Sequence, residues 1–109
     1  MAITVTTKVP ENVVRMATGT YIDTGTEAAY TYTNLGFKPR YVRVINLTSG
    51  DEECWIEGMT AAHAMKRLAA GTGAAIASLG ITVGDRGFTI GLDTDINKDS
   101  EQVHWYALG

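Results

Sequence analysis

The residues whose types and spacing come nearest to a chemical site lie between Asp93 and Glu101. In Asp93-Thr94-Asp95-Ile96-Asn97-Lys98-Asp99-Ser100-Glu101, oxygen-bearing side chains stand at every second position, as they do in a calcium-binding loop. Such a loop needs glycine at its sixth position and a bidentate acid at its twelfth, and these positions hold Lys98 and His104. We therefore expect a solvated connector between strands rather than a metal site.

A second possible chemistry is a thiolate activated by an imidazole, for which the chain offers Cys54 with His63 or His104. No local pattern joins these residues, and a lone cysteine on a strand is more often a small buried hydrophobic side chain. The same residues lack the spacing of zinc ligands. A single cysteine also excludes an internal disulfide. We expect no enzyme, no metal and no cofactor.

Three further motifs have ordinary structural explanations. The segment Gly71 to Ile76 begins like a dinucleotide-binding loop, but Ile76 replaces the third glycine, so we expect a turn. The adjacent acids Asp51, Glu52 and Glu53 are expected in water at the tip of a hairpin, where general acid-base chemistry has no buried acid to use. A small basic run, which we expect to form a polar rim, contains Lys38, Arg40 and Arg43.

Length and composition predict one globular domain over residues 1–109. Hydrophobic residues make up 45% and charged residues 19% of the 109 residues, which is ordinary for a folded domain. The net charge of -3 argues against a nucleic-acid partner. No secretory signal and no apolar run long enough to cross a membrane is present, so we expect a soluble protein assembled in a cytoplasm.

Period-2 alternation predicts strands in the first half of the chain. The expected strands and their partners are residues 2–8, then a hairpin of Val13 to Tyr21 with Ala28 to Thr33, then a hairpin of Tyr41 to Leu47 with Glu53 to Glu57. A connector over Asn34 to Pro39 separates the two hairpins. In the last of these strands, alternation places Cys54 and Ile56 on one face and Trp55 on the other.

The second half contains the only segment with helical features. Gly58 to Ala70 has apolar residues near helical spacing, and it can form either a short helix near residues 59–70 or a loop leading into a strand. Frequent glycines beyond it favour short strands, which we expect at Ala75 to Leu79, Ile81 to Val83, Phe88 to Leu92 and Val103 to Leu108. About eight short antiparallel strands predict an all-β domain, a β-sandwich or a jelly-roll-like barrel.

Large apolar side chains are numerous for so short a chain. Tyr41, Met59 and the tryptophans Trp55 and Trp105 either all lie in one core or are shared between a core and a contact with another chain. An extended N-terminal arm within residues 1–10, with alternating apolar residues ahead of Pro10, could add a strand to a neighbour's sheet. The interface residues predicted on these grounds are Ile3, Val5, Tyr41, Arg43, Trp55 and Met59.

Several segments together resemble small structural proteins of tailed bacteriophages, above all capsid decoration, or cement, proteins. The resembling segments are Ala17 to Tyr21, Leu35 to Asn46, Trp55 to Met59, Ala69 to Thr72, Gly80 to Val83, Arg86 to Ile90 and His104 to Ala107. The resemblance implies a non-enzymatic, homo-oligomeric virion protein, a dimer or trimer, on the capsid exterior, with the major capsid protein as its partner. The Gly36 to Val42 pattern also resembles tail-fibre modules, which leaves a host-recognising tail protein as the alternative.

Overall fold

The computed structural model describes residues 15–24 and 27–109, and these residues form strands and turns without a helix. The strands are β1 (Met16–Ile22), β2 (Tyr30–Tyr32), β3 (Tyr41–Asn46), β4 (Glu52–Ile56), β5 (His63–Arg67), β6 (Gly73–Val83), β7 (Phe88–Ile90) and β8 (Gln102–Leu108). The prediction of an all-β domain with about eight antiparallel strands is confirmed. No helix of the described residues is long and apolar enough to cross a membrane.

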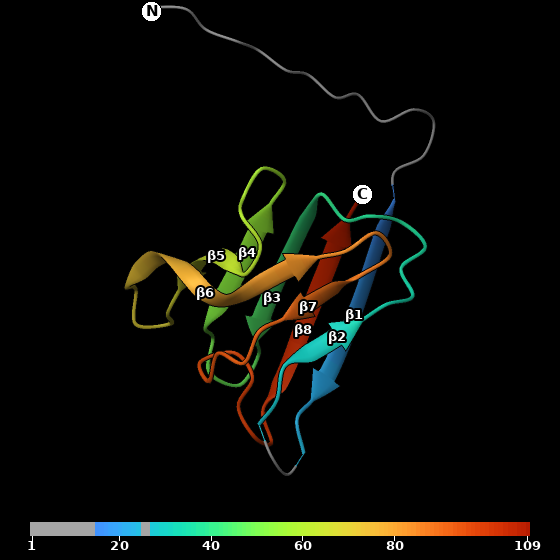
Figure 1. Ribbon diagram of the computed structural model, residues 1–109. Coiled ribbons are helices and arrows are strands. Elements are labelled where there is room, and N and C mark those ends of the chain that lie inside the picture. Colours follow the sequence, from blue (N-terminus) through green and yellow to red (C-terminus); the bar gives the residue numbers. More distant parts are fainter. Residues whose placement is uncertain (1–14, 25–26) are drawn as a thin grey trace, which may run out of the picture.

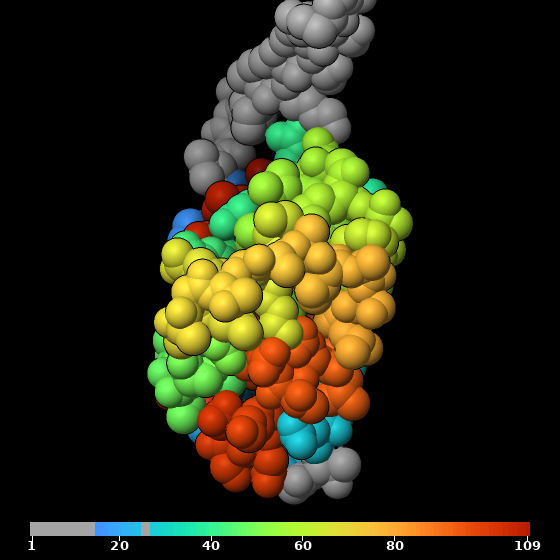
Figure 2. All heavy atoms as spheres, turned by 90° about the vertical axis from the view of Figure 1, so that its left-hand side faces the viewer, coloured from blue at the N-terminus to red at the C-terminus, as the bar shows by residue number. Residues whose placement is uncertain are grey.

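All eight strands belong to one sheet, in the order β1-β8-β3-β4-β5-β6-β7-β2. The sheet curls into a half-barrel, so that β6, β7 and β2 lie across from the layer of β4, β3, β8 and β1 (Figure 1). The expected sandwich therefore consists of two layers of a single folded sheet, joined through β5 and β6. Figure 2 shows this joining side, with β5 and β6 in yellow to orange across its middle.

The hairpin of β3 with β4 is confirmed, whereas the predicted hairpin of β1 with β2 is wrong. Tyr41 pairs with Ile56 and Ile45 with Glu52, as the turn residues between them predicted. In contrast β1 pairs with β8, and β2 pairs with β7. Both segments contain a strand, as their alternation predicted, but period-2 patterns specify a strand and not its partner. These two strands form the opposite edges of the sheet. The curl of the sheet brings the edges near each other, and the rings of Tyr21 and Tyr30 stack with their centroids 3.8 Å apart.

The helix considered near residues 59–70 is also wrong. Positive φ angles at Gly58 and Ala62, of 105° and 64°, break any helical run, and His63 to Arg67 form β5 between β4 and β6. Pairing on both sides outweighs the helical propensity of this segment, which is worth only fractions of a kcal/mol per residue. Beyond it, the two short strands expected on either side of Gly80 form the single strand β6, with a bulge.

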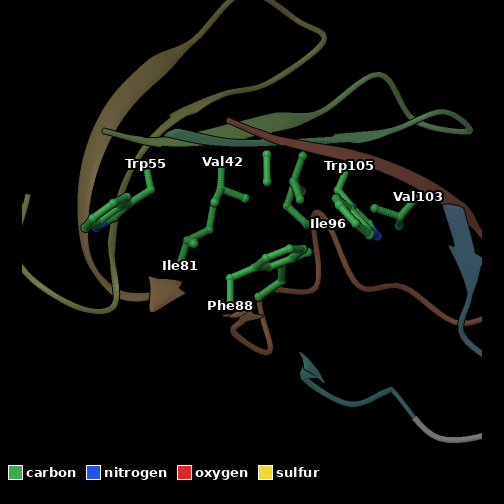
Figure 3. Packing of buried hydrophobic residues seen from close by; sticks show 10 residues of the cluster. Val42, Trp55, Ile81, Phe88, Ile96, Val103 and Trp105 are labelled. Atoms are coloured by element: carbon green, nitrogen blue, oxygen red, sulfur yellow. The ribbon is translucent and has the colours of Figure 1, made fainter. Parts of the chain in front are cut away.

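The core lies between the two layers of the folded sheet. Val42 and Trp105 come from one layer and approach Ile81 and Phe88 from the other (Figure 3). The buried apolar residues that pack together in this core are Val42, Val44, Trp55, Ile81, Phe88, Ile90, Ile96, Val103, Trp105 and Ala107. Both tryptophans are therefore core residues. The predicted strand at residues 2–8, with the arm that contains it, lies outside the described residues.

Candidate functional site

Five adjacent strands, β1, β8, β3, β4 and β5, turn every second side chain away from the core. These side chains form a surface that we call the outer face, and it consists of Met16, Thr18, Thr20, His104, Tyr106, Leu108, Tyr41, Arg43, Ile45, Glu52, Cys54, Ile56, Met65 and Arg67. The sheet register sorts them into rows that run across the strands, because directly paired residues point to the same side. The chemistry of the outer face follows from these rows.

The first row is entirely apolar. It runs from Met16 through Leu108 and Tyr41 to Ile56, each residue paired with the next across neighbouring strands. At its two ends, Met16 is 60% exposed and Ile56 is 49% exposed. A continuous stripe of this kind gains free energy when another surface covers it, at roughly 25 cal/mol for each Å² of apolar area removed from water.

The second row combines aromatic, basic and sulfur-bearing side chains. Its members are Thr18, Tyr106, Arg43, Cys54, Met65 and Ala75. Arg43 donates to the hydroxyl of Tyr106 at 3.5 Å, and the Tyr106 ring lies 5.8 Å from the ring of Tyr41 in the first row. The bond from Arg43 lowers the pKa of Tyr106, whereas burial and the neighbouring Tyr106 raise the pKa of Tyr41 to about 12. These contacts hold the aromatic pair in place before any partner arrives.

The third row supplies the charge. Glu52 accepts from Arg43 at 2.9 Å and lies 3.4 Å from the guanidinium of Arg67, while His104 and Ile45 continue the row toward β1. The charged groups are paired within the face, so a partner meets little unpaired charge there. Tyrosine, methionine and arginine are the residue types enriched in protein interfaces. The outer face therefore has the composition of a protein-binding surface.

The predicted interface residues are divided between this face and the core. Tyr41 and Arg43 lie in adjacent rows of the outer face, where they contact the same tyrosine. Trp55 is only 8% exposed and Met59 packs half-buried against the core, so the structure corrects the assignment of Trp55 to a surface. Its neighbours Cys54 and Ile56 share the opposite face, as the alternation predicted, and their burial shows that this face is the outward one. Ile3 and Val5 lie outside the described residues.

Sequence reasoning missed the outward residues Met16, Met65 and Tyr106. The alternation of β1 and β8 was visible, but only the register places these residues beside Tyr41 and Arg43. Met65 was assigned to a possible helix, and its outward position follows from its pairing with Cys54. The missing information was therefore the order of the strands in the sheet.

The loop expected to be a solvated connector instead closes one end of the half-barrel. Ile96 and Asn97 are fully buried and Asp93 is nearly so. Asn97 donates to the carbonyl of Gly91 at 3.0 Å and accepts from the hydroxyl of Tyr21, while Asn46 donates to the carbonyl of Ile96 at 2.9 Å. These bonds satisfy the polar groups that the inward loop carries, so the alternating oxygen atoms serve the fold.

Within this closed end lies a cluster of charged groups. Lys66 donates to both carboxylate oxygens of Asp93, at 3.0 and 2.8 Å, and also pairs with Asp95. Glu53, which was expected in water, is 1% exposed and faces inward opposite Lys66 across the β4–β5 pair. Burial and the nearby Asp93 carboxylate raise the pKa of Glu53 to about 9, so the carboxyl group stays protonated at neutral pH.

The other chemical candidates are not assembled into a reactive group. Burial raises the pKa of the Cys54 thiol, which keeps it protonated, and β3 separates its strand from that of His104 by two strand spacings, about 10 Å. The Nδ1 atom of His63 lies 3.1 Å from the carbonyl oxygen of Ala61. Among residues 15–24 and 27–109, no group of three or more potential ligands is arranged to hold a metal ion.

A shallow groove of about 420 Å³ lies on the opposite half of the sheet, over β2, β7 and the end of β6. A ladder of threonines, Thr31, Thr89 and Thr82, crosses it, and the hydroxyls of Thr31 and Thr89 are 2.9 Å apart. The polar groups of this groove therefore bond to each other. The apolar row of the outer face, in contrast, is not covered by the opposite layer of the sheet.

Comparisons of this chain with models of protein families, with curated proteins and with solved structures find no match.

Proposed function

We propose that this protein is a non-enzymatic structural subunit that attaches to a larger protein shell through its outer face. The observation that carries the proposal is the uncovered apolar row from Met16 to Ile56, flanked by the row that holds Arg43 and Tyr106. A continuous apolar row next to side chains whose charges are paired matches the composition of protein interfaces, in which the buried part is depleted of charge.

The shape of this surface suits a broad partner rather than a small ligand. The face extends over the four strands of one layer and the adjoining β5, and stable interfaces bury at least about 1,200 Å² in total. Small molecules bind in concave pockets that enclose most of their surface. A sheet face offers area without enclosure, which fits attachment to another protein surface.

The nature of the partner rests on the sequence resemblance to decoration proteins of tailed bacteriophages. On that basis the shell is a phage capsid, the contacted protein is the major capsid protein, and the subunit lies on the capsid exterior. Tyr41, Arg43 and Trp55 belong to the resembling segments, and the first two lie on the outer face. Arg43 is fixed by Glu52 and Tyr106, so its guanidinium is presented in one position to the capsid.

Co-sedimentation with phage heads that lack tails tests this proposal. We expect the purified protein to bind such heads saturably, and the variants Ile56→Asp and Met65→Asp to weaken binding by at least about tenfold, because each places an unpaired charge among the exposed apolar side chains of the outer face. Ile56 and Met65 are about half exposed, so both variants should fold.

The matched control is Thr82→Asp, which adds the same charge on the opposite half of the sheet, beside the threonine groove. This variant should bind like the wild-type chain. Equal binding by Ile56→Asp, Met65→Asp and the wild type would contradict the proposal, as would binding only to particles that carry tails.

A further inference from the structure

The two edges of the sheet differ in how well they are protected against pairing with another strand. The β2 edge has only three residues, and short edge strands are one of the devices by which proteins avoid such pairing. The β1 edge is seven residues long, and its sequence, MATGTYI, contains neither a charged residue nor proline. A long, regular and uncharged edge is a template for a further strand.

The hydrogen-bonding groups that this edge presents can be assigned from the register. Gly109 donates its N–H to the carbonyl of Arg15 at 2.9 Å, which makes these two residues a hydrogen-bonded pair of the β1–β8 ladder. In an antiparallel ladder such pairs alternate along the strand. Ala17, Gly19 and Tyr21 therefore bond to β8, and the N–H and C=O groups that point outward belong to Met16, Thr18, Thr20 and Ile22.

This edge is complementary to itself. When two copies of β1 run antiparallel about a two-fold axis at Gly19, Met16 lies opposite Ile22 of the second copy, and Thr18 lies opposite Thr20 of the second copy. Each of these residues presents outward backbone groups, so every pair can form both ladder bonds. Met16 and Ile22 are 60% and 53% exposed, and the pairing would cover both.

The charges flanking the strand agree with the same register. Arg15, which is exposed, stands just before β1, and Asp23 stands just after it. Antiparallel pairing centred on Gly19 brings Arg15 opposite Asp23 of the second copy at both ends of the contact. Because Oδ2 of Asp23 is buried in its own chain, this register avoids contacts between like charges rather than adding a fully exposed ion pair. A parallel arrangement would place like charges side by side, and cross-strand like charges are destabilising.

We infer that β1 is a dimerisation edge, at which a second copy of this chain pairs antiparallel about Gly19 and joins the two sheets into one. This inference goes beyond the proposed attachment to a shell and stands without it, because it concerns the purified chain alone. The resulting dimer would place its two outer faces on the same side of a continuous sheet.

The test is sedimentation equilibrium of the whole chain and of two charge variants, over a wide range of concentrations. In T18K/T20K, lysine faces lysine in the expected register, and the dimer dissociation constant should rise by roughly tenfold or more. In T18K/T20E, each lysine instead faces a glutamate of the second copy, and the dissociation constant should return to near the wild-type value. Thr82→Lys, on an interior strand, should have no effect.

Amide exchange gives a second readout that does not depend on variants. The N–H groups of Thr18 and Thr20 should exchange more slowly at protein concentrations where the dimer forms, whereas those of Ala17 and Gly19, already bonded to β8, should change little. A wild-type chain that is monomeric at all concentrations overturns the inference. A dimer that T18K/T20K leaves intact, or that T18K/T20E weakens equally, contradicts the Gly19 register.

Discussion

The inner and outer faces of β3, β4 and β8 come from alternate residues of the same strands, and both are rich in large apolar side chains. Inside, Val42, Val44 and Trp105 are almost completely buried by the opposite layer. Outside, Tyr41 and Ile56 belong to a stripe that the opposite layer does not cover, in which Tyr41 is half-buried and Ile56 is exposed. Hydrophobicity alone therefore does not distinguish a core from an interface, and the curl of the sheet decides which face is covered.

The comparison predicts that substitutions on the two faces separate stability from binding. Inner substitutions should lower the free energy of unfolding, since they create cavities or clashes in a close-packed interior. Outer substitutions should leave the free energy of unfolding nearly unchanged and weaken attachment.

The largest effect is expected for Trp105→Ala. The indole contacts Phe88 at a ring distance of 4.9 Å and Tyr32 at 5.1 Å, so its removal opens a large cavity between the layers. We expect the free energy of unfolding to fall by about 3–5 kcal/mol. Urea denaturation of this variant should be compared with that of Tyr106→Ala, which truncates the next residue on the outer face and should cost about 1 kcal/mol or less.

Gly19→Ala should have the next largest effect. A Cβ atom at this position would lie 2.6 Å from Cζ2 and 2.8 Å from Nε1 of Trp105, which packs directly over the glycine. Overpacking of this kind costs about 1–3 kcal/mol. Thermal unfolding should show the loss, whereas Thr18→Ala, whose side chain points outward, should unfold close to the wild-type temperature.

Glu53→Gln should change the pH dependence of the free energy of unfolding, because Glu53 is the one acidic side chain on the inner face of β4. The folded protein holds Glu53 protonated up to a pKa of about 9, whereas the unfolded chain releases this proton near 4.5. The wild-type free energy of unfolding should therefore fall as pH rises between these values, because only the folded state keeps the proton. The neutral variant should lack this fall and, at pH 8, be more stable than the wild type by on the order of 1 kcal/mol or more.

Glu52→Gln is the matched control, since Glu52 is the adjacent residue on the outer face. Its ion pairs with Arg43 and Arg67 are partly exposed, and such pairs contribute little to stability. The control should therefore keep the wild-type dependence on pH. Identical pH profiles of Glu53→Gln and the wild type would show that Glu53 is not held protonated in the fold.

The smallest effect on stability is expected for the double variant Tyr41→Ser and Ile56→Ser. Both residues lie in the apolar row of the outer face, where their removal creates no cavity. Denaturant unfolding should change by about 0.5 kcal/mol or less per residue, the usual range for surface positions. A loss of several kcal/mol would instead mean that this row belongs to a core.

Local patterns predicted the strands well and their partners poorly. Alternation placed Trp55 on the opposite face from Cys54 and Ile56 without specifying which face is the core, and the turn after β3 predicted its hairpin. The pairing of β1 with β8 joins the first and last strands of the described residues, and no local signal specifies it. The same long-range order assembles Met16 and Tyr106 beside Tyr41, so the candidate surface could only be predicted in part.

The buried polar end shows a second limit of sequence reasoning. A run of acidic and amide side chains predicts a solvated loop, because burying such groups without partners is costly. Here Asn97 and Asp93 bury their polar atoms against the side chains of Tyr21 and Lys66, which distant strands supply, and against the nearby carbonyl of Gly91. Those partners exist only once the sheet has curled.

The most direct test of the outer face as an attachment surface is a density map of phage heads saturated with the protein. We predict that the side of the sheet carrying Tyr41, Arg43, Ile56 and Met65 is buried against the capsid, with the threonine groove over β2 and β7 turned toward solvent. A map in which the outer face is open to water, and the chain contacts the shell through the groove or the loop after β7, would contradict the account.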